Sequence, residues 1–207
     1  TPKQEKKLPR FLYPSEIELL MDAPDSQKPI GLRDKAILET LYAAGMRVSE
    51  LVGMDVSDID WDEAYIKLKG KGNKERIVGI GPTAVKSMLR YLTTWRQALA
   101  VNDTEQAFFL SETGRALTYS GLGQAIKRLG RKAGVERLRA HLFRHTFAVR
   151  YLLNGGDLMS LRLTLGHTTI AVTQMYLHLA DSHVQALQHK YSPVESLGLG
   201  KRRGRAK

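Results

Sequence analysis

The chain has no cysteine among its 207 residues, which excludes disulfide bonds, thiolate nucleophiles and metal sites built from thiolates. No run of residues approaches the roughly 20 apolar positions that a membrane span requires. The chain starts with TPKQEKKLP, which is polar and charged and unlike a secretory signal peptide. We therefore expect a protein of the reducing cytoplasm, without a membrane partner.

Acidic residues are also in short supply. The chain has 21 Asp and Glu against 32 Lys and Arg, so its formal net charge at pH 7 is +11. Such an excess favours a polyanionic partner, and nucleic acid is the commonest one; an indifferent basic surface is the alternative. Hydrophobic residues make up 43% of the chain, so length and composition predict one globular domain with a substantial core.

Helices dominate the expected secondary structure. Ser15 is a candidate N-cap of the first helix, and Gly45 is expected to end the second. Three short strands, over about 56–59, 64–68 and 75–80, should form a small antiparallel sheet in which 70–74 turn the second strand into the third. The predicted fold class is therefore α+β, mainly α-helical, with a small three-stranded antiparallel sheet. Apolar spacing predicts helices over about 15–23, 32–44, 84–100, 119–133, 140–154, 157–165, 170–178 and 181–189, and a short helix from Arg47.

Both ends of the chain are basic. Residues 1–12 carry three lysines and an arginine and indicate an interdomain linker. The last seven residues, KRRGRAK, include five basic ones, so residues 191–207 are expected to form a basic tail. One domain is therefore expected over 13–190.

The stretch HLFRHTF carries the most specific pattern for phosphate chemistry. On a helix, His141 and Arg144 share a face, so an imidazole and a guanidinium can reach one anion together. A surface arginine beside a core histidine is the alternative. His145 points about 100° away from Arg144 and is expected in packing or behind the site. His141 and His145 have the spacing of zinc helices, but the intervening arginine and the lack of an acidic partner argue against a metal site.

Two further cationic groups belong to exposed turns. Arg47 follows the helix stop at Gly45; Glu50 could brace it, or the two could form an ordinary surface pair. Lys71 lies between glycines in GKGNK, and a lysine whose pKa falls in a cationic site can give a proton to a leaving oxygen. A solvated basic turn is the alternative. The neighbouring cations are expected to contact backbone phosphates of DNA; they are Lys69, Lys74 and Arg76.

The stretches GMRVSEL, KGKGNKER, HLFRHTF and LGHTTIAVTQMY, in this order and at these spacings, resemble the catalytic domain of the tyrosine recombinases, or phage integrase family, especially its Xer-like and transposon or phage integrase branch. The resemblance extends from about Pro14 to His189. It implies Tyr176 as the nucleophile, nine residues after His167, because a phenol flanked by cations and imidazoles can attack phosphorus. The catalytic residues that it implies are Arg47, Lys71, His141, Arg144, His167 and Tyr176.

The resemblance also implies an activity and partners. Double-stranded DNA would be cut and rejoined through a 3′-phosphotyrosyl intermediate, without a divalent metal or a cofactor. Family members act as tetramers on two DNA sites, so we expect a monomer without DNA and a neighbour-docking segment at 181–189. The family's N-terminal DNA-binding domain is absent from this chain, so a catalytic fragment is expected.

Two other classes stay open at this point: a type IB topoisomerase and a non-catalytic DNA-binding protein. Within the recombinases, chromosome dimer resolution, phage integration and transposition are all compatible with the motifs.

Overall fold

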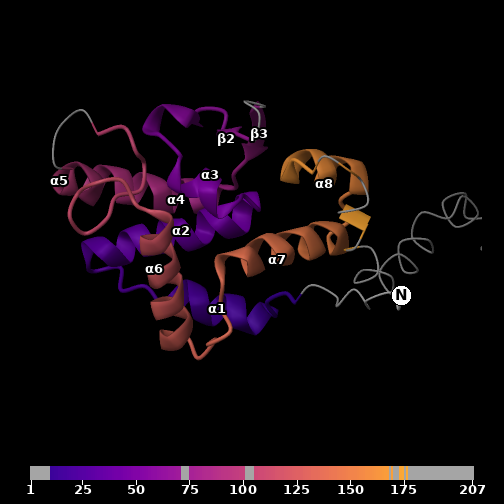
Figure 1. The fold of residues 1–207 in the computed structure, drawn as a ribbon, viewed down its shortest axis with the longest axis horizontal. Helices are drawn as coiled ribbons and strands as arrows, with labels where there is room; N and C mark the ends of the chain where they lie inside the picture. The colour runs from indigo at the N-terminus through magenta and orange to yellow at the C-terminus, as the bar shows by residue number, and fades with distance from the viewer. Residues whose placement is uncertain are drawn as a thin grey trace, which may run out of the picture.

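Helices make up most of the computed structural model, which describes residues 10–70, 75–100, 105–167, 169, 173, 174 and 176 (Figure 1). This confirms the predicted mainly helical α+β class. The predicted helices over 170–178 and 181–189, the turn at 71–74 and the tail lie wholly or largely outside the described residues. The helical elements are α1 (Pro14–Asp22), α2 (Pro29–Ala44), α3 (Val48–Val52), the 3-10 turn η1 (Val56–Asp58), α4 (Pro82–Tyr91), the π-helical turn η2 (Leu92–Arg96), α5 (Gln97–Leu99), α6 (Tyr119–Lys132), α7 (Ala140–Leu153) and α8 (Leu158–Leu165).

The sheet is antiparallel, with the order β1 (Ile59–Asp60), β2 (Tyr65–Lys69) and β3 (Glu75–Gly79). The predicted three-stranded sheet is thus confirmed, but a strand over 56–59 is wrong for its first three residues. They form η1 instead, because a carboxylate oxygen of Asp58 accepts the backbone N–H of Asp55 at 2.9 Å and closes a tight turn. Side chains alternate along β2 and β3, so Leu68 and Val78 are buried.

The helix boundaries follow from local chemistry. Ser15 is not the N-cap of α1: Tyr13 is, because Pro14 occupies the first helical position. Glu16 accepts the backbone N–H of Tyr13 at 2.8 Å. Gly45 ends α2 as predicted, in the left-handed conformation with φ of 56°. A Cβ atom at Gly45 would also lie 2.4 Å from the Phe147 ring, so glycine lets α7 approach this turn.

The central helix α2 packs against α1, α4 and α7, and most of the buried side chains form one core around it. A second, smaller cluster joins α7 to α8 and consists of Ala148, Val149, Leu152, Leu161, Leu165 and Tyr176. Helix α8 also lies beside β3 (Figure 1). No helix among the described residues is both long and apolar enough to cross a membrane.

Candidate active site

Arg144, on α7, is buried with 5% of its surface exposed. Its two terminal nitrogens donate to the carbonyl oxygens of Gly45 and Leu165, each at 2.7 Å. Burial, followed by the charge of Arg47, lowers the pKa of Arg144 to about 10. The guanidinium stays charged at neutral pH, and its fork joins α7 to the ends of α2 and α8.

Arg47 is the N-cap residue of α3, which begins one residue later. Its Nη1 donates to Glu50 Oε1 at 2.8 Å, its backbone N–H donates to Glu50 Oε2 at 2.7 Å, and its Nη2 donates to the Gly166 carbonyl at 3.0 Å. The Glu50 side chain is only 4% exposed. Glu50 therefore braces Arg47 from inside the protein, and the alternative of a surface pair is wrong.

Arg76, on β3, faces the protein and not the solvent. Its register partner on β2 is the buried Leu68, so both side chains lie on the inner face of the sheet. Arg76 donates to both carboxylate oxygens of Glu50, at 2.6 and 2.8 Å, and its side chain is 13% exposed. Its predicted contact with DNA phosphates stays a prediction.

The three arginines meet at one helix end. Three successive carbonyls, those of Thr164, Leu165 and Gly166, accept hydrogen bonds from Arg76, Arg144 and Arg47 respectively. A helix leaves its last carbonyls without partners inside the helix, and its C-terminus carries partial negative charge. The end of α8 therefore gathers three cations from β3, α7 and α3. Glycine at position 166 leaves room for these arginine side chains, since a Cβ atom there would lie 3.2 Å from Arg76.

His167 follows directly after this helix end. Its Nδ1 lies 2.9 Å from Thr173 Oγ1. Burial, then the charges of Arg144, Arg47 and Arg76, lower the pKa of His167 to about 4. The imidazole is consequently neutral at pH 7 and can act as a hydrogen-bond partner without adding charge.

Tyr176 belongs to the smaller core cluster and is 2% exposed. Its phenol oxygen lies 2.7 Å from Nδ1 of His145. Burial raises the pKa of Tyr176, and the charge of Arg144 opposes this rise. Since the phenol is protonated at neutral pH, it needs a proton acceptor to become a nucleophile.

His145 is the site residue whose place the sequence argument missed. Positions four apart on a helix are neighbours, so His145 borders the same region as the exposed His141, and their ring centroids are 5.6 Å apart. The 100° turn from Arg144 does not remove it from the site, because His141 lies between the two directions. Burial, then His141 and Arg144, lower the pKa of His145.

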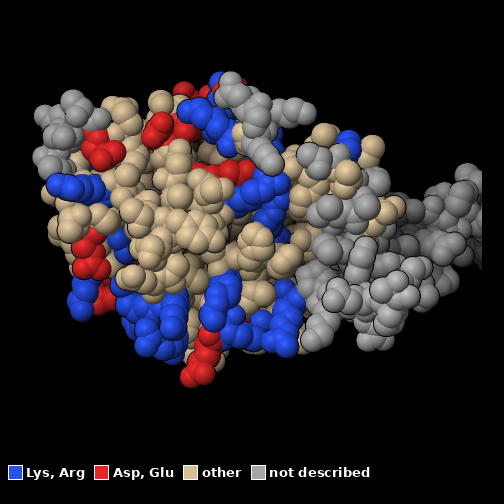
Figure 2. Space-filling model, viewed as in Figure 1, with Lys and Arg blue, Asp and Glu red and all other residues tan. Residues whose placement is uncertain are grey.

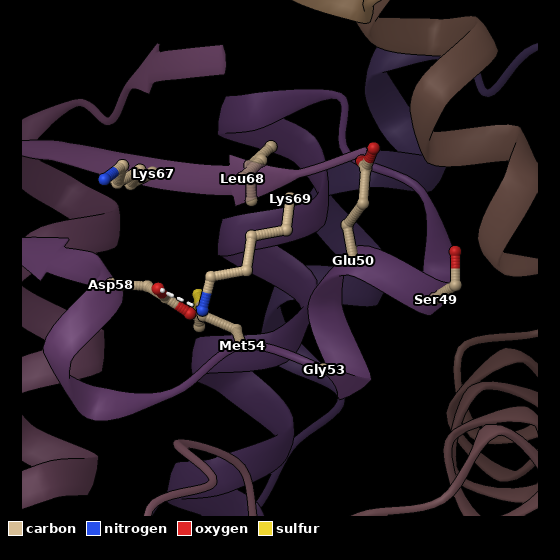
Figure 3. A pocket seen from close by; sticks show the side chains of 8 residues that line it. All are labelled: Ser49, Glu50, Gly53, Met54, Asp58, Lys67, Leu68 and Lys69. Carbon is tan, nitrogen blue, oxygen red and sulfur yellow. Dashed lines mark ion pairs between the residues drawn. The ribbon is translucent and has the colours of Figure 1, made fainter. Parts of the chain in front are cut away.

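Lys69 is the predicted DNA-contacting lysine of the hairpin that the structure describes, and its side chain is largely exposed. Lys69 forms an ion pair with the buried Asp58 at 3.2 Å, while its side chain stays 54% exposed. The two residues line a pocket of about 100 Å³ between α3 and the sheet (Figure 3). Lys71 and Lys74 lie outside the described residues. On the face drawn in Figure 2, Lys and Arg gather over the lower end of α6 and the loop that leads to α7.

The site therefore unites four of the six predicted catalytic groups in a single neighbourhood: Arg47, Arg144 and His167 meet at the end of α8, and Tyr176 packs against α7 and α8. His141 lies one turn before His145. Only Lys71 has no described position.

Comparison with known proteins agrees with the fold and the motifs. Residues 10–183 match the model of the phage integrase family. Tyrosine recombinase XerD of Staphylococcus epidermidis is 41% identical over 194 residues, which are 93% of this chain and 66% of that protein. The crystal structure of XerA recombinase has a TM-score of 0.75 at 32% identity, covering 93% of this chain and 67% of that one. XerH recombinase bound to palindromic difH substrate after cleavage has a TM-score of 0.73 at 25% identity, covering 91% and 54%.

The architecture is that of the catalytic domain of tyrosine recombinases. The chain belongs to the phage integrase family. It spans 66% of the length of the XerD relative, slightly less than two thirds.

Proposed function

We propose that this chain is the catalytic unit of a site-specific DNA recombinase that cleaves and rejoins double-stranded DNA through a 3′-phosphotyrosyl intermediate. The observation that carries the proposal is the convergence of Arg47 and Arg144 on adjacent carbonyls at the end of α8. Two neighbouring guanidinium groups can bind the two non-bridging oxygens of a phosphodiester under attack. The XerH relative, held with its DNA substrate after cleavage, supports DNA as the partner.

The roles of the residues follow from their chemistry. Arg47, Arg144 and His141 would hold the scissile phosphate, with His167 as a neutral hydrogen-bond donor. The phenol oxygen of Tyr176 would attack phosphorus, and the bond to the 5′ oxygen would break as Lys71 supplies its proton. The covalent link keeps the energy of the phosphodiester, so the reverse attack by a 5′ hydroxyl reseals the strand. Side chains neutralise the charge, and we propose neither a metal nor a cofactor.

The partners of the whole protein belong to the same proposal. Residues 13–190 would form the catalytic domain, flanked by the linker 1–12 and the basic tail 191–207. The greater length of the XerD relative supports a DNA-binding domain outside this chain that completes a clamp. Four copies would act on two DNA sites, with 181–189 docking on a neighbour and a monomer in the absence of DNA. Action on DNA also goes with a cytoplasmic location.

The test is incubation with a nicked suicide substrate, followed by mapping of the residue that becomes linked to DNA. We expect an adduct at Tyr176, undiminished in excess chelator and without any nucleotide. Tyr176→Phe removes one oxygen and little volume, so it should abolish the adduct while DNA binding stays within about twofold. An adduct elsewhere, or one that needs added magnesium, would contradict the proposal. Relaxation of supercoils without pairing of two sites would instead indicate a topoisomerase.

A further inference from the structure

The phenol of Tyr176 has a specific partner. His145 Nδ1 and Tyr176 Oη are 2.7 Å apart, and the two ring centroids lie 5.8 Å apart with an interplanar angle of 49°. The side chains come from α7 and from the segment after α8, so the bond crosses between two parts of the chain. Because Tyr176 is 2% exposed, this contact forms in a site largely closed to water.

Two other histidines among the described residues near the site are placed differently. Nδ1 of His167 is hydrogen-bonded to Thr173 Oγ1 at 2.9 Å. His141 is exposed one turn earlier on α7, with its ring perpendicular to that of His145. It is directed by the helix to the same side as Arg144, three residues on, where a phosphate would lie. Among the described residues, His145 is the one whose ring nitrogen meets the phenol oxygen.

The surroundings of His145 keep its ring unprotonated, with a lone pair free to meet the phenol. Burial and the nearby His141 and Arg144 lower its pKa, so its ring is neutral at pH 7. Among the described residues, the titratable groups that face it are His141 and Arg144 on its own helix, Tyr176 from the segment after α8, and His167 at the end of α8. A neutral imidazole has one nitrogen lone pair, and Nδ1 can use it to accept the phenolic hydrogen.

We propose that His145 is a catalytic residue that accepts the phenolic proton of Tyr176 during cleavage and returns it during rejoining. This inference rests on the proposed recombinase function. As the bond from the phenol oxygen to phosphorus forms, the proton moves to His145 Nδ1. The bond from phosphorus to the 5′ oxygen breaks, and that oxygen takes a proton from Lys71. In the reverse step, imidazolium reprotonates the departing phenol oxygen and the 5′ hydroxyl returns its proton to Lys71.

His145→Gln separates proton transfer from positioning, because the amide keeps a hydrogen-bonding group but cannot take a proton at neutral pH. In single-turnover cleavage of the suicide substrate, His145→Gln and His145→Ala should both form the Tyr176 adduct about 10²-fold or more slowly. DNA binding should be unchanged. The residual rate of His145→Gln should rise steadily with pH, since the phenol must then ionise without a base.

The matched control is Tyr151→Phe, which removes a hydrogen bond of 2.8 Å between Tyr151 and Ser160 in the same pair of helices. It should cleave within about threefold of the wild type, because its phenol has no part in the proton transfer. Cleavage by His145→Gln at the wild-type rate would overturn the proposal in favour of a purely structural bond. Faster cleavage would also overturn it, and would show that His145 restrains the tyrosine.

A measurement on the unmutated histidine keeps the test independent of folding. In ¹⁵N-histidine NMR spectra, Tyr176→Phe should shift the Nδ1 resonance of His145 and leave that of His167 in place. An unchanged His145 resonance would overturn the proposal. Failure of the recombinase function itself would look different, because the wild-type chain would then form no adduct at Tyr176 at all.

Discussion

At the scale of single residues, Arg144 joins two helix ends and is also proposed to bind a phosphate. A lysine at this position could not do both. Its two terminal nitrogens reach the carbonyls of Gly45 and Leu165, which are 99 and 21 residues away in sequence. An ammonium group is a compact point charge and cannot span both carbonyls while also facing a phosphate. We therefore expect Arg144→Lys to lower the free energy of unfolding by about 1–3 kcal/mol, and to slow cleavage by on the order of 10²-fold.

Urea unfolding and single-turnover cleavage would measure the two effects separately. Arg137→Lys is the matched control, because Arg137 pairs with Glu16 at 2.6 Å away from the end of α8. It should change cleavage by less than about threefold. Near-normal cleavage by Arg144→Lys would show that no forked contact is needed.

Lys71 can be tested by chemistry although its position is not described. The ladder pairs Lys69 with Glu75, and Lys71 lies between them in the sequence. If Lys71 protonates the leaving 5′ oxygen, Lys71→Ala should lose cleavage but not DNA binding. A substrate with sulfur at the 5′ bridging position has a leaving group that needs little protonation, so it should restore cleavage by this variant. Rescue of Lys74→Ala but not of Lys71→Ala would identify the other lysine as the acid.

At the scale of elements, apolar spacing and glycine stops predicted the described helices closely. Helix α2 begins at Pro29, earlier than expected, because proline is suited to the first helical turn. Strand alternation would also have predicted the inward direction of Arg76, which shares the face of Val78 two residues on.

The arginine cluster at the end of α8 could not be read from the sequence in the same way. It joins Thr164, Leu165 and Gly166 to arginines 88, 21 and 119 residues away. Local patterns describe neighbours within a few residues, whereas these contacts depend on how α3, β3, α7 and α8 pack. The sequence could identify which residues carry chemistry, but only the fold shows which carbonyls and carboxylates hold them.

The Glu50 carboxylate links α3 to β3, and this link depends on pH. Its bonds to Arg76 and Arg47 outweigh burial and hold the pKa of Glu50 at about 2, below the usual 4.5. A depressed carboxyl pKa contributes stability that is complete above 4.5 and is lost as the pH falls towards 2. Arg76→Gln should raise the folded-state pKa of Glu50 towards 4.5, so the stability lost between pH 4.5 and pH 2 should become smaller.

Urea midpoints measured from pH 7 down to pH 2 would test this link. His167 also contributes stability that is lost as the pH falls from about 6.5 to 4, because the folded protein favours its neutral form. Glu50→Gln serves as the control, since it removes the carboxyl that titrates. The difference in urea midpoint between wild type and Glu50→Gln should narrow below pH 4.5. In the Glu50→Gln background, Arg76→Gln should not change how much stability is lost at acid pH. If Arg76→Gln changed the stability lost at acid pH equally in the wild-type and Glu50→Gln backgrounds, the Arg76–Glu50 link would be contradicted.

At the scale of the whole molecule, the site exists only when the two cores are joined. The larger core carries α2, α3 and the sheet, whereas the smaller one carries Tyr176 between α7 and α8. Arg47 and Arg76 connect α3 and the sheet to the end of α8 by hydrogen bonds. Helix α7 contributes apolar side chains to both cores, Phe143 to the larger one and Val149 to the smaller one. The phosphate-binding groups and the nucleophile are therefore held together by these charged contacts and by the packing of α7 in both cores.

The net charge of +11 predicts how the whole chain binds DNA. If most contacts are to phosphates, affinity should be weak and should fall steeply as salt rises, because binding releases counterions.

Lys69, 54% exposed, and Arg76, 13% exposed, provide a matched pair on the same hairpin. Lys69→Gln should reduce the slope of log affinity against log salt by about 1. Arg76→Gln removes the same charge from an inward position and should leave the slope almost unchanged, although it weakens the site. Salt titrations of both variants by fluorescence anisotropy would measure the slopes. If the two variants had equal slopes of log affinity against log salt, the outward direction of Lys69 would not be what determines its contact with DNA.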